Sequence, residues 1–198
     1  MGYKYRSGFS PSERKELKII MFFPKEIFEQ CKITTPEYGF EPELIYAVCL
    51  QEGGKNKDGS FAPDIARLEQ GYYRSYVEPM TLATTSEVLL SASYGIMQMI
   101  GLSLKEAGFF NWYFDQCTEG MKKLLLQPLS QFAIPNAIDA YCINLKWMIE
   151  WGCKWMKTKE KKAKGDIRKM LGYWNGDLSG KYADEVLRKY EKVKKENL

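Results

Sequence analysis

The stretch 136–156 carries apolar residues at helical spacing, and this pattern restricts the fold more than any other feature of the chain. Its apolar positions recur every three or four residues, so a helix places all of them on one face. They are Ile138, Tyr141, Cys142, Leu145, Met148, Ile149, Gly152 and Trp155. We therefore expect one long helix over 136–156 with its stripe in a hydrophobic core, and a mainly α-helical protein around it.

Local start signals predict several helices before this one. Ser10-Pro11-Ser12-Glu13 is a capping box that opens a helix through about residue 23, and Pro24 opens a second helix toward residue 33. A third helix is expected over 42–52, with a proline at its first position. Residues 53–101 are rich in Gly, Ser and Thr, so we expect turns and a small irregular sheet there.

Stop signals and periodicity predict three more helices. A short one over 103–107 is closed by Gly108, and two others follow the long helix, over 166–174 and 181–195.

The length and composition favour one globular domain. With 198 residues, 45% of them hydrophobic, we expect a domain over 42–198 preceded by a helical extension over 1–41. No apolar run approaches the roughly 20 residues that span a bilayer. The N-terminal residues lack the apolar centre of a secretory signal. We therefore expect synthesis in the cytoplasm without a signal peptide, and no stable membrane insertion.

Glu52 is a carboxylate at the end of an apolar helix face. Leu44, Val48 and Glu52 are spaced i, i+4, i+8, so they stack along one side of the helix, and Gly53-Gly54 is expected to end it as a left-handed cap. Partial burial raises the pKa of a carboxyl, as a general acid requires. The alternative is a glutamate that simply turns to solvent at the helix end.

The chain contains no histidine, and this narrows the possible chemistry. Ser-His-Asp triads, Cys-His dyads and His-ligated zinc sites are excluded. The five cysteines show no metal-ligand spacing, and no glycine-rich phosphate loop is present. We expect neither a metal nor a cofactor. Carboxylates, Tyr and Lys remain as reactive groups, which favours glycoside or proton-transfer chemistry.

The formal net charge of +4 is concentrated in residues 154–169, which hold eight basic and two acidic residues. Such a run is either a solvated helix end or a patch for a polyanion such as a cell wall, a membrane surface or a nucleic acid. No nucleic-acid-binding signature accompanies it, so a nucleic-acid partner is not expected.

Four motifs, taken in order, resemble those of lytic transglycosylases with the soluble, lysozyme-like type of catalytic domain. They are Glu52 with a small residue after it, Ser93-Tyr94-Gly95-Ile96-Met97-Gln98-Met99, Trp174-Asn175-Gly176, and Tyr182-Ala183-Asp184-Glu185-Val186-Leu187. The stretches Ala66-Arg67-Leu68-Glu69, Tyr72-Tyr73-Arg74 and Ala107-Gly108-Phe109 also resemble a phage and prophage branch of this family.

The resemblance implies an α+β lysozyme-like fold, a helical bundle with a small irregular β region and a substrate cleft. It implies cleavage of the MurNAc-GlcNAc β-1,4 bond of peptidoglycan glycan strands, with anhydromuramic ends as product. Glu52 corresponds to the single catalytic general acid and base. The residues implied in substrate binding are Glu69, Ser93, Tyr94, Gln98, Tyr173, Trp174, Asn175 and Tyr182. Such an enzyme acts at the bacterial wall or periplasm, and without a signal peptide it depends on a holin or on a virion for delivery.

The chain departs from the family pattern at several positions. Gly53 stands where the family has serine, Trp174 where it has tyrosine, Ile100 where the branch often has methionine, and 118–135 is a longer connection. Adjacent Tyr173 is an alternative source of the missing hydroxyl.

Two other functions stay open. One is a hydrolytic muramidase, with Asp58, Asp64 or Glu69 as its second carboxylate. The other is a non-catalytic wall-binding or virion structural protein with the same fold.

Overall fold

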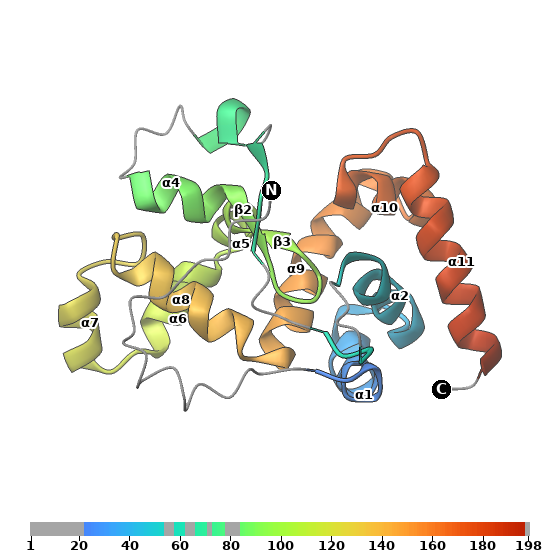
Figure 1. Ribbon diagram of the computed structural model, residues 1–198, viewed down its shortest axis with the longest axis horizontal. Coiled ribbons are helices and arrows are strands. Elements are labelled where there is room, and N and C mark those ends of the chain that lie inside the picture. Colours follow the sequence, from blue (N-terminus) through green and yellow to red (C-terminus); the bar gives the residue numbers. More distant parts are fainter. Residues whose placement is uncertain (1–21, 54–57, 62–65, 71–72, 78–83, 197–198) are drawn as a thin grey trace.

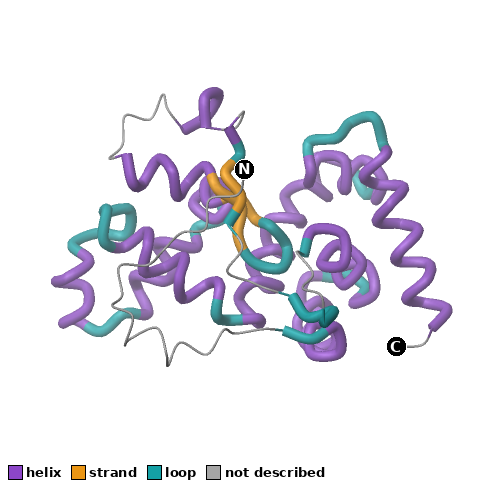
Figure 2. Tube along the Cα trace, viewed as in Figure 1, coloured by secondary structure: helices purple, strands orange, loops and turns teal. Residues whose placement is uncertain are grey.

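The computed structural model describes residues 22–53, 58–61, 66–70, 73–77 and 84–196 (Figure 1). These residues form a mainly α-helical protein with a small antiparallel sheet (Figure 2). The elements before the sheet turn are α1 (Pro24–Thr34), the 3-10 helix η2 (Thr35–Tyr38), α2 (Pro42–Glu52), β1 (Arg67–Leu68), the π-helix η3 (Tyr73–Val77), α4 (Thr84–Ser91) and β2 (Ala92–Tyr94). Those after it are β3 (Met99–Ile100), α5 (Gly101–Glu106), α6 (Phe109–Gln116), α7 (Glu119–Leu125), α8 (Ala133–Cys142), α9 (Leu145–Ala163), α10 (Ile167–Asn175) and α11 (Lys181–Glu196).

The helices lie in two groups on either side of α9 and the sheet. In Figure 1, α1, α2, α10 and α11 lie on one side, and α4, α6, α7 and α8 lie on the other. Helix α2 packs against α11 and α1, and α10 packs against α9. The end of α2, which carries Glu52, is therefore close to the α10–α11 pair. Within the described residues, no helix combines the length and the apolar character needed to cross a membrane.

One hydrophobic core connects α1 to the rest of the molecule. Ile27, Phe28 and Cys31 are buried in the same cluster as the apolar face of α2, and α1 also packs against α9. Residues 24–34 therefore pack in the same core as the residues after 41. The helix predicted to start at the Ser10 capping box lies almost wholly outside the described residues.

The predicted long helix over 136–156 is wrong, because the structure divides it into α8 and α9. The break falls at Asn144, whose backbone is extended (φ −116°, ψ 97°) and whose side-chain oxygen accepts a hydrogen bond from the Trp147 N–H at 3.0 Å. An asparagine cap satisfies an N–H at the start of the new helix. The apolar stripe continues across the break, so periodicity alone does not reveal it.

Other predicted elements are confirmed within a few residues. Helices begin at Pro24 and Pro42 as predicted, α5 ends just before Gly108 with its positive φ of 89°, and α10 and α11 cover the two predicted C-terminal helices. The region 53–101 does contain the small sheet, but α4 and η3 in the same region were not predicted. The connection over 118–135 contains α7, which the Thr118 side chain caps.

The sheet has the order β1-β2-β3, and Ser93 lies at its centre. Ser93 is opposite Arg67 on one side and Ile100 on the other, and all pairs are antiparallel. The turn from β2 to β3 uses positive φ angles at Gly95 (71°) and Gln98 (48°). This register places the side chains of β1 and β2 close to the turn that carries Gln98.

Two buried methionines hold this turn against α9. The Ile96 N–H lies 3.4 Å from the Met148 sulfur, and a Cβ added at Gly95 would lie 2.6 Å from that sulfur. A Cβ added at Gly152 on α9 would lie 2.8 Å from the terminal methyl carbon of Met97. Both methionine side chains have no exposed surface. The two thioethers therefore leave little room for a side chain at either glycine.

Candidate functional site

Glu52 is the last residue of α2 and its side chain is partly buried. Burial raises the pKa of its carboxyl above the ordinary value of 4.5. Four groups oppose that rise because they favour the ionised form: Tyr182 most strongly, then Asn175, the charge of Arg67, and the Trp174 side chain. The pKa is raised in spite of these groups, so burial is the larger effect.

The opposing groups come from three elements that are distant in sequence. Trp174 and Asn175 end α10, Tyr182 lies in the first turn of α11, and Arg67 lies on β1. Gly176 reverses the chain after Asn175 with a φ of 84°, and its N–H donates to the Gly172 carbonyl at 2.8 Å. The structure thus brings together Glu52 and three of the residues named from the sequence.

Asp177 fixes the start of α11, and the sequence analysis did not identify it. Its Oδ2 accepts from the Tyr182 N–H at 2.8 Å, and its Oδ1 accepts from the Ser179 N–H at 2.9 Å and from the Ser179 hydroxyl at 2.6 Å. These bonds hold the pKa of the Asp177 carboxyl below its usual range. The signal in the sequence is an aspartate two residues before a serine, which is typical of a side-chain-capped turn.

The hydroxyl of Tyr182 is a buried donor directed toward Glu52. The side chain is only 7% exposed, and its hydroxyl forms no hydrogen bond of regular geometry with the rest of the described chain. Burial raises the pKa of Tyr182, and the nearby Glu52 charge raises it further. The phenol therefore stays protonated, so it can donate toward Glu52 while its oxygen can accept from the Trp174 side chain.

Ser93 lies in a second cluster with two of the other predicted residues, Gln98 and Glu69. Its hydroxyl lies 3.1 Å from Gln98 Oε1, 3.3 Å from Glu69 Oε1 and 3.3 Å from the Arg67 carbonyl. One hydroxyl proton cannot be donated to three acceptors at once, so these positions share it. The Gln98 amide nitrogen donates to the Gly95 carbonyl at 2.8 Å. This cluster supports β1, which carries Arg67 beside Glu52.

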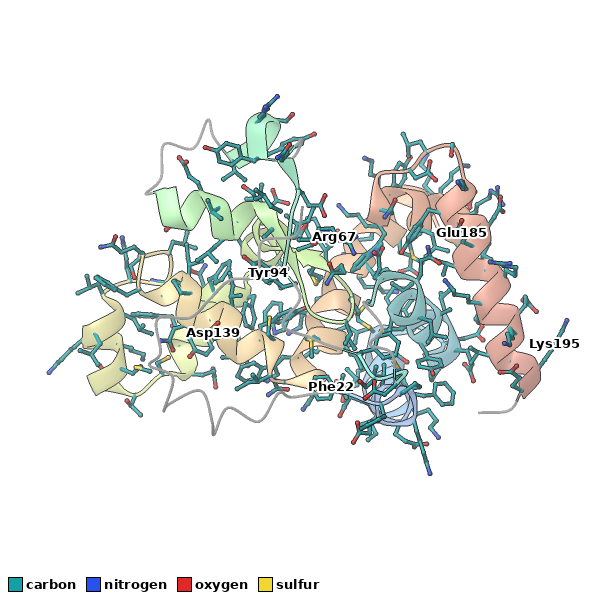
Figure 3. The ribbon with its side chains drawn as sticks, in the orientation of Figure 1. Phe22, Arg67, Tyr94, Asp139, Glu185 and Lys195 are labelled. Carbon is teal, nitrogen blue, oxygen red and sulfur yellow. The ribbon has the colours of Figure 1, made fainter. Side chains whose placement is uncertain are left out.

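Tyr94 and Tyr173, which the resemblance implies in substrate binding, make other contacts in the structure. Tyr94 is 4% exposed and its hydroxyl donates to the Leu89 carbonyl at 2.8 Å, so it is a core residue and not a surface for a ligand. In the view of Figure 3, Arg67 lies on the side of the sheet nearer α10 and Tyr94 on the side nearer α4 and α5. The Tyr173 ring faces Lys162, whose ammonium lies 4.3 Å from the ring centroid. The Trp174 side chain, and not the Tyr173 phenol, acts on Glu52.

Gly53 is required for close packing and not for a left-handed cap. Its backbone is extended (φ −64°, ψ 128°), so the predicted left-handed cap is wrong at this position, and Gly54 lies outside the described residues. A Cβ at Gly53 would lie 2.5 Å from Cε1 of Phe61, whose side chain has no exposed surface. Phe61 is itself paired with Phe22 by two backbone hydrogen bonds of 3.1 and 2.8 Å. A serine at position 53 would overlap the Phe61 ring, so packing gives a steric reason for glycine at this position.

The other carboxylates considered as partners of Glu52 have different surroundings. Asp58 accepts from the Ser60 N–H at 3.0 Å and from its hydroxyl at 2.6 Å, which lowers the pKa of the Asp58 carboxyl. Glu69 lies with Ser93, and Asp64 is outside the described residues. The described part of the chain contains no group of three or more acidic or cysteine side chains arranged to hold a metal ion.

Two cavities lie away from Glu52. One of about 440 Å³ lies between α2 and α11, and its lining includes Tyr46, Leu50 and Arg188. A smaller one of about 110 Å³ lies near Phe40 and Tyr190. Neither is lined by Glu52, so the substrate cleft implied by the resemblance stays an expectation.

No protein-family model, curated protein or solved structure matches the chain.

Proposed function

We propose that this protein is a peptidoglycan lytic transglycosylase with a lysozyme-like fold and that Glu52 is its general acid and base. The observation that carries this proposal is the surroundings of Glu52: a carboxyl whose pKa is raised by burial, beside Tyr182, Asn175, Trp174 and Arg67. Asp139 is also a carboxyl whose pKa is raised by burial, but burial is the only cause of its shift, so it lacks the donors that surround Glu52.

These surroundings suit a group that gives up a proton and takes one back. Burial favours the protonated carboxyl, which can donate to the oxygen of a glycosidic bond as that bond breaks. Once the proton has left, Tyr182 and Asn175 stabilise the carboxylate by hydrogen bonding, and Arg67 stabilises it by charge. The same carboxylate then accepts a proton from the attacking hydroxyl.

A single carboxylate favours the transglycosylase product over hydrolysis. The main influences on the pKa of Glu52 include no described carboxylate, whereas a retaining hydrolase places its second carboxyl about 5–5.5 Å from the first. Asp58 is bound within its own turn and Glu69 is bound to Ser93. Without a base to activate water, the 6-hydroxyl of muramic acid has the advantage of being tethered to the reacting centre. We therefore expect anhydromuramic ends.

The test is mass spectrometry of the muropeptides that the purified protein releases from sacculi. Wild-type protein should release anhydromuramic products, and Glu52→Gln should lower release by several orders of magnitude, because the amide cannot donate the proton. Glu69→Gln is the matched control, since it removes a carboxylate of the neighbouring cluster and should leave the product type unchanged.

The outcomes separate the candidate functions. Reducing muramic ends from the wild type would replace the proposal with a muramidase. Binding to sacculi with no release by the wild type would indicate a wall-binding or virion structural protein. Wild-type release by a folded Glu52→Gln variant would remove Glu52 from the proposal. Action at the wall, with delivery by a holin or a virion, belongs to the same proposal.

A further inference from the structure

The basic residues of 154–169 fall into two groups when their ion pairs are considered. Four are paired with a nearby acid: Lys154 with Glu150 at 2.8 Å, Lys169 with Asp166 at 3.1 Å, Lys157 with Glu160, and Arg168 with Asp184. The other four form no ion pair within the described part of the chain, and we call them the α9 lysine cluster: Lys159, Lys161, Lys162 and Lys164. The unbalanced charge of this segment therefore lies at the C-terminal end of α9.

Aromatic rings hold two lysines of this cluster in place. The Lys159 ammonium lies 4.0 Å from the centroid of the Trp155 ring, and the Lys162 ammonium lies 4.3 Å from that of Tyr173. Cation–π contacts restrict such long side chains without neutralising them. The helix dipole favours cations near a helix C-terminus, but it does not fix ammonium groups over aromatic rings as those of Lys159 and Lys162 are fixed.

The two ammonium groups repel each other. Lys159 is half-buried, and burial lowers its pKa; Glu106 opposes this, while the Lys162 charge lowers the pKa further. A pair of fixed cations with one acid nearby is stabilised when an anion binds between them.

The pair lies next to the residues that surround Glu52. Helix α10 packs against α9, and Tyr173 directly precedes Trp174, so adjacent Cα atoms of α10 lead to Lys162 on one side and to Glu52 on the other. Lys162 and Glu52 are therefore connected through two adjacent residues of α10.

We propose that Lys159 and Lys162 form an anion-binding site for an anionic glycan polymer, one whose repeating units carry carboxylate or phosphate groups. The choice of a wall glycan as partner rests on the proposed function, whereas the anion site itself rests on the lysine geometry. A lysine covers one face of each ring, and both rings are partly buried against the hydrophobic core, which disfavours stacking of nucleic-acid bases on them.

The test compares two double variants in a Glu52→Gln background, where sacculi are bound without being cleaved. Lys159→Gln/Lys162→Gln removes the proposed site. Lys154→Gln/Lys157→Gln is a matched control, since it removes two charges from the same helix and two lysines that also lie over rings, Trp151 at 3.8 Å and Phe40 at 5.0 Å. The control lysines differ in being ion-paired.

Sedimentation with purified sacculi measures the binding. At about 10 mM salt the Lys159/Lys162 variant should bind about tenfold more weakly, roughly threefold for each lysine, and the control should bind nearly as wild type. The difference should shrink at about 150 mM salt, because ions screen exposed charges. Circular dichroism checks that both variants are folded.

Chemically treated sacculi identify the anion. Loss of the lysine effect after hydrofluoric acid, which removes phosphodiester-linked polymers, assigns phosphate, and loss after carboxyl amidation assigns carboxylate. Equal weakening by both double variants, or an unchanged Lys159/Lys162 variant at low salt, would overturn the proposal. So would a lysine effect seen only with anionic vesicles or DNA. Muropeptide release by the protein with Glu52 intact reports on the proposed function separately, so the two proposals can fail independently.

Discussion

Serine at position 53, the residue that lytic transglycosylases have there, should destabilise this protein. The extended backbone of Gly53 is accessible to any residue, so Gly53→Ser costs nothing in backbone strain and gains about 0.4–1 kcal/mol by restricting the unfolded chain. Against this, the new Cβ would lie 2.5 Å from Cε1 of Phe61 and 2.7 Å from the Cys49 carbonyl oxygen.

The magnitude follows from how little Phe61 can move. Its side chain is fully buried and its backbone is paired with Phe22, so relief requires displacing packed atoms. Overpacking of this kind costs about 1–3 kcal/mol, and central values of about 2 kcal/mol for this cost and about 0.7 kcal/mol for the gain leave a net loss of about 1.3 kcal/mol. For a chain of this length that lowers Tm by about 3–5 °C. Muropeptide release should also fall, because the displaced chain adjoins Glu52.

Thermal unfolding followed by circular dichroism measures the effect, and a double-mutant cycle with Phe61→Leu identifies its cause. The smaller side chain should recover about 0.5–2 kcal/mol of the loss that Gly53→Ser produces in the wild-type background. A Gly53→Ser variant that melts at or above the wild-type temperature would refute the steric argument. Strictly additive effects in the cycle would refute it equally.

Three more predictions concern Glu52, the neighbouring Tyr182, and the break between α8 and α9 at Asn144. Glu52→Gln should raise the free energy of unfolding at pH 7, because the folded state raises the pKa of Glu52 and so disfavours the ionised carboxyl. This gain over wild type should vanish below the ordinary pKa of 4.5, where the carboxyl is protonated in both states. Urea titrations at pH 7 and pH 4 that give equal differences between variant and wild type would contradict this. Tyr182→Phe removes a donor that favours the carboxylate, so the alkaline limb of the pH–activity profile should move to higher pH, and an unmoved limb would show that the hydroxyl does not act on Glu52. Asn144→Ala should cost about 1 kcal/mol, or about 2–4 °C in Tm, while Asn144→Asp, which keeps the capping oxygen, should stay near wild type.

The sequence predicted helices best where the start signal is local. Pro24, Pro42 and Asp166 each lie at the beginning of a helix, and each acts through its own backbone or side chain. The break at Asn144 was missed because the apolar stripe runs through it. Helix α4 was missed because its Thr- and Ser-rich start has weak helix propensity, which packing against α5 and α8 overrides.

The candidate site was predictable only in part, for a similar reason. Motif order singled out Glu52, Trp174, Asn175 and Tyr182, and the structure brings these residues together. Sequence spacing does not indicate whether the Tyr173 ring or the Trp174 ring turns toward Glu52. It also cannot reveal that Phe61 packs against Gly53, since that contact depends on the fold of the intervening chain.

The buried methionines give the turn between β2 and β3 a chemical response to oxidants. Met97 and Met148 have no exposed surface, so peroxide reaches their sulfur atoms only when the turn separates from α9. A sulfoxide adds a polar oxygen where Gly95 and Gly152 leave no room, so an oxidised chain cannot close again in the same way. The rate at which these two methionines are oxidised therefore reports how often the turn that carries Gln98 separates from α9.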